Sequence, residues 1–91
     1  MKVNDASELT ILQINTKWNQ RNDVDIPSIR GCVVQYAFLE DQSPSFRQKI
    51  DYVPVIVLYK GNKPVHQWSA DLSFKLKITK EEIYEVVERF R

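Results

Sequence analysis

The sequence predicts one α/β domain spanning residues 1–91, built on a mixed four-stranded sheet that is flanked by helices. Three observations carry this prediction. The length and the 43% content of apolar residues suit a single core, the first three apolar runs are separated by helical segments, and the last two are joined by a tight turn. Crossovers through helices make strands parallel, whereas a tight turn makes them antiparallel. The expected element order is β-α-β-α-β-β-α.

The first half of the chain predicts two strands with a helical segment between them. Residues 9–14 (LTILQI) are short, apolar and partly β-branched, which indicates a buried strand. The polar residues 15–23 indicate a loop. A short helix is expected over residues 22–30, where Pro27 would end or kink a longer one. Residues 32–39 (CVVQYAFL) are the second predicted strand.

The second half predicts a short helix followed by a hairpin. Ser43 suits a helix N-cap with proline after it, so a two-turn helix is expected over residues 44–50. Residues 55–59 (VIVLY) form the most apolar run and predict the central strand. The turn sequence KGNK at residues 60–63 and the apolar residues 65–68 then predict an antiparallel returning strand.

The last predicted element is a helix with a clear start and a clear apolar face. Thr79 and Glu82 have the spacing of a capping box, in which each side chain bonds the backbone amide of the other residue. An apolar stripe at helical spacing follows and should pack on the sheet; it consists of Ile83, Val86, Val87 and Phe90.

Composition excludes several classes of function. A net charge of +1 lacks the basic footprint of a dedicated nucleic-acid binder. No run of 18 apolar residues is present, and residues 1–7 are polar, unlike a signal peptide, so we expect neither a membrane partner nor secretion. One cysteine, Cys32, permits no intramolecular disulfide, which suits a reducing, cytoplasmic location. With a single histidine as well, no structural zinc site and no cofactor are expected.

The order of elements and one tryptophan resemble the thioredoxin family. In that family a strand leads into a Trp-Cys-x-x-Cys motif at the start of a helix. Here the strand at 10–15 leads into Trp18, and asparagines, Asn19 and Asn22, stand at both cysteine positions. Pro27 corresponds to the proline that often kinks the following helix in the family.

A second landmark of the family lies further along the chain. The sequence Tyr52-Val53-Pro54 resembles the step before the family's central strand, and the resemblance implies a cis peptide bond at Pro54. Gln13 occupies the position of the family's buried acidic residue. The resemblance covers residues 9–70 and a final helix, but the family's usual first strand and helix have no counterpart before residue 9. The first helix is shorter than usual, and about five extra residues precede the last helix, as the same comparison implies.

The chemistry of the family is missing from the motif position. Disulfide exchange needs a thiolate, and the amides of Asn19 and Asn22 can neither attack a disulfide nor form one. Cys32 lies away from the motif loop, and a small buried residue is the favoured interpretation of it. The alternative function is a divergent thiol oxidoreductase that works through Cys32 with a partner. Asp23 and Asp25 favour a helix-dipole role over a metal site.

By resemblance, the motif loop and the proline loop form a groove for a partner protein or an extended peptide. Val53 would offer backbone hydrogen bonds, while Trp18 and Tyr52 would form apolar walls with polar groups attached. Two alternatives stay open: Trp18 packs on the shortened helix, and Pro54 serves the fold alone. The predicted partner-binding residues are Trp18, Asn19, Gln20, Arg21, Asn22, Tyr52, Val53 and Pro54.

A second candidate surface lies at residues 71–79 (DLSFKLKIT). Apolar and polar residues alternate there, which indicates a half-buried strand or an extended edge. Such an edge could pair with another chain, so homodimerisation or partner docking is a hypothesis, with lysines on the other side as a guard against aggregation. The apolar positions of this candidate interface are Leu72, Phe74, Leu76 and Ile78.

The sequence therefore predicts a non-catalytic, thioredoxin-like protein-binding module. It would act as an adaptor, an inhibitor or a small subunit of a larger assembly, and a phage- or virus-encoded accessory protein would be one example. Thiol chemistry at Cys32 is the enzymatic alternative. A purely structural role in an assembly is a third hypothesis, which differs from the first in stoichiometry and permanence.

Overall fold

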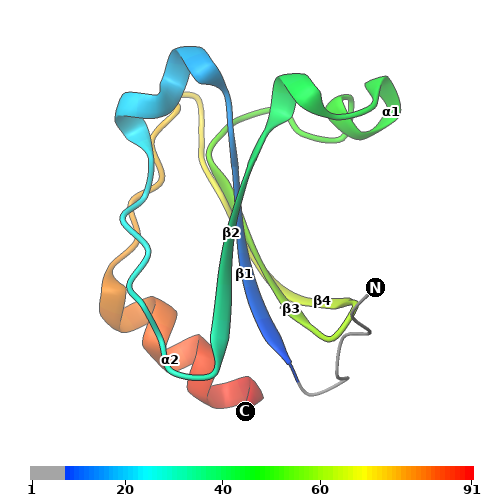
Figure 1. The fold of residues 1–91 in the computed structure, drawn as a ribbon. Coiled ribbons are helices and arrows are strands. Elements are labelled where there is room, and N and C mark those ends of the chain that lie inside the picture. The colour runs from blue at the N-terminus through cyan, green and yellow to red at the C-terminus, as the bar shows by residue number, and fades with distance from the viewer. Residues whose placement is uncertain (1–7) are drawn as a thin grey trace.

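The computed structural model describes residues 8–91 and confirms the predicted α/β fold class. A mixed four-stranded sheet has the order β2-β1-β3-β4, in which β1 is parallel to β2 and antiparallel to β3, and β3 and β4 form the predicted hairpin (Figure 1). The strands are β1 (Leu9–Asn15), β2 (Cys32–Phe38), β3 (Val55–Lys60) and β4 (Lys63–Ser69). The helical elements are the 3-10 helices η1 (Lys17–Asn22) and η2 (Leu39–Asp41) and the α-helices α1 (Pro44–Arg47) and α2 (Lys80–Phe90).

One face of the sheet carries the main core because α2 packs against it (Figure 1). The period of two in the strands places alternate residues of β1 and β3 on this face, where they meet the apolar stripe of α2. The buried members of this cluster are Leu9, Ile11, Ile29, Ile56, Leu58, Ile83, Val86 and Val87. Burying this stripe is what stabilises α2, since an isolated helix of eleven residues is marginal in water.

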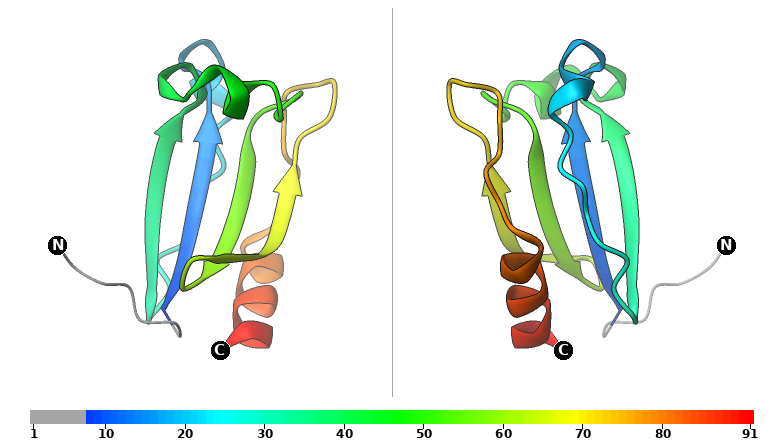
Figure 2. Two further views of the ribbon diagram at one scale, coloured as in Figure 1. Left: turned by 90° about the vertical axis from the view of Figure 1, so that its right-hand side faces the viewer. Right: turned by 90° about the vertical axis from the view of Figure 1, so that its left-hand side faces the viewer.

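Within residues 8–91, the opposite face of the sheet is covered at one end, by the segment around α1 (Figure 2). Val57 of β3 is buried there, whereas Val33 of β2, which alternates onto the same face, is exposed. Helix α1 is shorter than predicted: it ends at Arg47, and turn hydrogen bonds carry the chain to Ile50. Its N-cap Ser43 accepts a hydrogen bond from the amide of Phe46, as expected for the sequence Ser-Pro.

The predicted capping box at the start of α2 is confirmed. The Thr79 hydroxyl oxygen accepts a hydrogen bond from the Glu82 amide at 3.1 Å, and the Glu82 carboxylate accepts one from the Thr79 amide at 3.4 Å. None of the helices formed by residues 8–91 has the length and apolar character needed to cross a bilayer.

The helix predicted over residues 22–30 is wrong. The helical turn comes earlier, in η1, within the segment predicted as a loop, and the chain from Asp23 to Ile29 has no regular structure. The side chain of Gln13 explains this difference. Its amide group donates to the carbonyl of Val24 at 3.0 Å, and its carbonyl oxygen accepts from the amide of Val24 at 2.7 Å. The amide and carbonyl groups of Val24, which a helix would use, are thereby both bonded to Gln13, so this segment does not form a helix.

Of the half-buried strand or extended edge predicted over residues 71–79, the strand is wrong. The chain turns at its start, because the Asp71 carboxylate accepts from the amide and hydroxyl of Ser73 and the Asp71 carbonyl accepts from the amide of Phe74. Phe74 then has a positive φ of 57°. Beyond it, Leu76 and Ile78 pack against the core, so the alternation marks an extended connection on α2's side rather than a hydrogen-bonded strand.

Candidate functional site

The two segments that correspond to the predicted groove meet at one end of the sheet. Helix η1 follows the last residue of β1, and the Val53–Pro54 step precedes the first residue of β3. Because β1 and β3 are antiparallel, the end of one lies beside the start of the other, with Ile14 opposite Val55. The peptide bond between Val53 and Pro54 is cis, which confirms what the resemblance implied.

Asn19, at the first cysteine position, is a buried structural residue. Its side-chain nitrogen lies 3.2 Å from the carbonyl oxygen of Val53 and 3.1 Å from that of Phe74, and 3.0 Å from the side-chain oxygen of Asn15. Asn22, at the second cysteine position, donates to the Asn19 side-chain oxygen at 2.7 Å. The two amides thus join η1 to the proline step and to the 71–79 segment.

This arrangement changes the role of two predicted contact residues. Asn19 is 2% exposed and Val53 is equally buried, and the Val53 carbonyl already accepts a hydrogen bond from Asn19. Neither residue therefore presents these groups at the surface. Their hydrogen bond instead holds η1 against the proline step beneath the surface.

The space between the two predicted apolar walls is filled by Phe74. Its ring makes edge-to-face contacts with Trp18, at a centroid distance of 5.1 Å, and with Tyr52, at 5.7 Å. The turn that Asp71 stabilises and the bond from Asn19 to the Phe74 carbonyl hold this residue in its unusual backbone conformation. The place that the resemblance assigns to an extended peptide is therefore occupied by the chain itself.

Several predicted residues remain exposed around Phe74. Trp18 packs on Phe74 through one edge yet keeps 65% of its surface exposed, so it does not pack down onto a helix. Leu72, at the tip of the turn before Phe74, is 75% exposed. We call these residues the η1-end surface; its members are Trp18, Gln20, Arg21, Tyr52, Leu72 and Phe74.

A polar network extends from η1 towards β2. Asn15 donates to the backbone carbonyl of Asn19 at 3.0 Å and to the carboxylate of Asp23 at 2.6 Å. The same carboxylate oxygen accepts from the hydroxyl of Tyr36 at 2.8 Å. Partial burial, followed by the hydrogen bond to the charged Asp23, raises the pKa of Tyr36 to about 12. Asp23 is thus a structural acceptor, and Asp25 forms an ion pair with Lys80.

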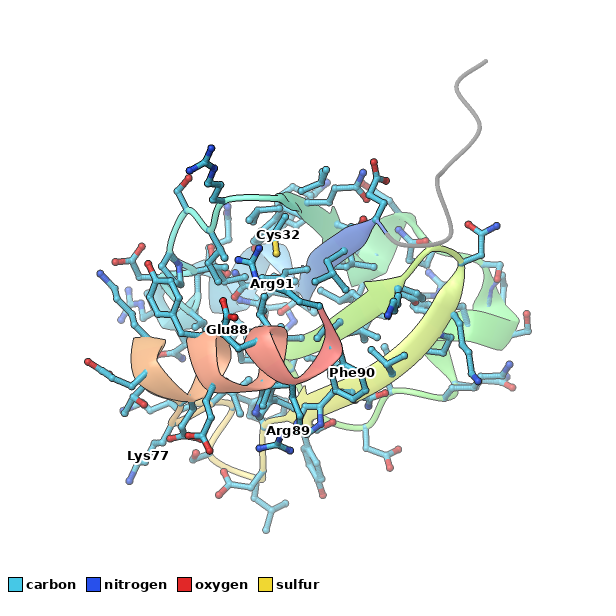
Figure 3. All side chains as sticks on the ribbon, turned by 90° about the horizontal axis from the view of Figure 1, so that it is seen from below. Cys32, Lys77, Glu88, Arg89, Phe90 and Arg91 are labelled. Carbon is cyan, nitrogen blue, oxygen red and sulfur yellow. The ribbon has the colours of Figure 1, made fainter. Side chains whose placement is uncertain are left out.

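Cys32 lies at the far end of the sheet from η1, at the start of β2. Figure 3 shows it beside Arg91, near the end of α2. The thiol is partly buried, and this burial raises its pKa, with Arg91 acting in the opposite direction and Glu88 in the same direction. A raised pKa disfavours the thiolate that disulfide exchange requires.

Other chemical groups in the described part of the chain give no further site. His66 packs against the ring of Trp68 at a centroid distance of 4.5 Å, as a packed strand histidine would. No group of three or more His, Cys, Asp or Glu residues within residues 8–91 could hold a metal ion.

Sequence reasoning missed the roles of Gln13, Asn15 and Phe74. A signal for the first two was present, because Gln13 and Asn15 continue the alternation that buries Leu9 and Ile11. Polar residues at buried positions need partners, and both residues hydrogen-bond the segments around η1. For Phe74 the sequence carried no comparable signal, since its alternation with lysines matched a strand.

Comparison with known proteins supports the fold and goes no further. No protein-family model matches the sequence, and no curated protein matches it. Among solved structures, thioredoxin F from spinach chloroplast is similar, with a TM-score of 0.63 and 13% sequence identity. The similarity covers 98% of this chain and 76% of the spinach chain. The chain therefore has a thioredoxin-like fold.

Proposed function

We propose that this thioredoxin-like protein is a non-catalytic protein-binding module that contacts its partner through the η1-end surface. It would act as an adaptor, an inhibitor or a small subunit of a larger assembly. The observation that carries the proposal is Trp18, which keeps 65% of its surface exposed while its ring is braced by Phe74.

The position of the family's motif carries no thiols. Asn19 and Asn22 hold η1 and the proline step together through hydrogen bonds, a role that needs amides and has no redox chemistry. The single thiol of the chain, Cys32, lies at the other end of the sheet, and burial raises its pKa. These features support binding over disulfide exchange.

The η1-end surface combines apolar and polar side chains. Tryptophan is enriched among the residues that dominate binding energy, because it combines a large apolar ring with one hydrogen-bond donor. Exposed Leu72 adds apolar area, and Gln20 and Arg21 add polar groups around it. The contacts of Phe74 with Trp18 and Tyr52 order the surface before a partner arrives, which lowers the entropic cost of binding.

Affinity capture from cells that make the protein, followed by titration of the purified partner, tests this proposal. We expect Trp18→Ala to weaken the complex by about 30-fold, the loss that a binding hot spot of about 2 kcal/mol produces. Tyr84→Ala is the matched control, since Tyr84 is an exposed aromatic on α2, away from this surface. A folded Trp18→Ala variant that binds its partner as tightly as the wild type would refute the proposal.

A parallel assay separates binding from the enzymatic alternative. Reduction of insulin disulfides by dithiothreitol should proceed no faster with the protein than without it. The Cys32→Ser variant should also bind the captured partner with unchanged affinity. A rate enhancement that disappears in Cys32→Ser would instead establish thiol chemistry at Cys32.

A further inference from the structure

Strand β2 forms one outer edge of the sheet, as Figure 2 shows. It pairs with β1 along one side, and no strand within residues 8–91 pairs with its other side. An edge strand exposes a row of backbone donors and acceptors that suit another strand. The backbone groups on the outer side of β2 therefore have no partner strand within residues 8–91.

The side chains of β2 carry none of the usual protection against such pairing. The strand reads CVVQYAF, without a charged residue or a proline over its seven residues. Its middle is exposed on both faces of the sheet, with Val34 45% exposed and both Val33 and Tyr36 at 41%. A strand of a monomeric protein seldom exposes apolar residues that follow one another along the chain.

The other edge of the sheet shows what protection looks like in this fold. Strand β4 begins with Lys63 and Pro64, a charge and a residue without an amide donor, and its pairing with β3 is irregular between Leu58 and Tyr59. Lysine, proline and bulges are the devices by which natural edges avoid pairing. One edge has all three, and the other has none.

We propose that β2 pairs antiparallel with β2 of a second copy of this chain, about a two-fold axis that passes midway between the Gln35 residues of the two copies. An antiparallel pair of identical edges requires an axis perpendicular to the sheet, and such an axis keeps each face on its own side. The register must therefore be symmetric about one residue. Centring it on Gln35, the middle of the seven, pairs every residue of the strand.

The strand is complementary to itself in this register. Val34 of one copy lies opposite Tyr36 of the other on the α2 face, and Val33 lies opposite Ala37 on the other face. Valine opposite tyrosine is a favourable cross-strand pair, and each pair occurs twice because of the symmetry. The net charge of +1 per chain adds little repulsion between copies. The two sheets would join into one continuous sheet.

This proposal is independent of the proposed function, because it uses the edge of β2 and not the η1-end surface. It also replaces the dimer hypothesis for residues 71–79, which form no strand. A complete chain that is dimeric through β2 is compatible with either outcome of the Trp18 experiment.

The first test is the molar mass of the whole protein in solution, measured by light scattering over a series of concentrations. We expect a rise to twice the mass of one chain, and no larger species, since a two-fold interface closes. Val34→Lys should abolish this rise, because it places two lysines within the paired strands. Gln67→Lys, on the exposed edge strand β4, is the matched control and should dimerise normally. A wild type that stays monomeric at all concentrations, or forms open-ended species, would overturn the proposal.

The second test fixes the register by cross-linking. Directly opposed residues of antiparallel strands have Cα atoms about 4.5–5.5 Å apart, within the range that a disulfide spans. A Gln35→Cys variant in a Cys32→Ser background should therefore form an intermolecular disulfide under mild oxidation, and Gln67→Cys in the same background should not. A wild-type dimer whose Gln35→Cys variant fails to cross-link would disprove this pairing, and both variants must show the wild-type circular dichroism spectrum.

Discussion

Strands β2 and β3 flank the same central strand, β1, and have similar compositions, yet their surroundings are opposite. β3 reads VIVLYK and is buried over its first four residues, with Leu58 fully excluded from solvent. β2 reads CVVQYAF and is exposed over four consecutive residues. Both strands bond β1 along their whole length.

The difference shows that apolar character predicts a strand but does not predict its burial. β3 has a strand on each side and α2 over one face, and its Val55 and Val57 are buried on the other face. Within residues 8–91, β2 has a strand on one side only, and its middle residues are exposed on both faces. The same residue types therefore stabilise the fold in β3 and remain free for another contact in β2.

The largest predicted effect follows from truncation within β3. Leu58→Ala should lower the free energy of unfolding by about 2–5 kcal/mol, because it removes buried methyl groups and leaves a cavity between the sheet and α2. Val34→Ala in β2 removes a similar group from an exposed position and should cost less than about 1 kcal/mol in the monomer. Urea denaturation at low protein concentration measures both values. Equal losses at the two positions would contradict the contrast between the strands.

A second prediction concerns Asn19, whose hydrogen bonds hold the residues just before β3. Asn19→Ala should cost about 1–3 kcal/mol of stability, because the carbonyls of Val53 and Phe74 lose the donor that they share. Gln20→Ala, at the adjacent exposed position, is the control and should cost less than about 0.5 kcal/mol. Urea denaturation checks the pair, and a similar small loss in both would show that Asn19 is not structural.

Much of this fold was readable from local patterns. The capping box of α2, the KGNK turn and the apolar run of β3 each depend on a few adjacent residues, and each appears where it was expected. The cis bond before Pro54 followed from the resemblance alone. These features were predictable because their causes lie within the segment concerned.

The parts that escaped prediction depend on residues far apart in the chain. Residues 23–29 are extended because Gln13, eleven positions before Val24, occupies the backbone groups of that residue. The predicted groove is filled because Phe74 reaches Trp18 from across the sheet. Propensity and periodicity carry no information on such contacts, so tertiary structure overrode both.

A third prediction compares one substitution at two places on the same face of the sheet. Val57→Thr in β3 should cost about 1–3 kcal/mol, because the new hydroxyl is buried among apolar groups. Val33→Thr in β2 should change the stability of the monomer by less than about 0.5 kcal/mol, because its hydroxyl reaches water and threonine keeps the strand preference. Thermal or urea unfolding of the two variants gives the comparison. A costly Val33→Thr at low concentration would mean that β2 is covered in the monomer.

The smallest predicted effect concerns Tyr36, whose hydroxyl group anchors the exposed strand to Asp23. Ultraviolet titration should show a late component with a pKa of about 12, which is lost in Tyr36→Phe and retained in Tyr84→Phe. Because the folded pKa exceeds the ordinary value of 10, the folded state retains a proton that the unfolded chain releases first. The stabilisation is complete below pH 10 and declines as pH rises towards 12. Asp23→Asn should move the late component down, since it removes the charged acceptor, while partial burial still holds it above 10. If the component persists in Tyr36→Phe, it does not come from Tyr36, and the hydrogen bond between that hydroxyl and charged Asp23 is contradicted.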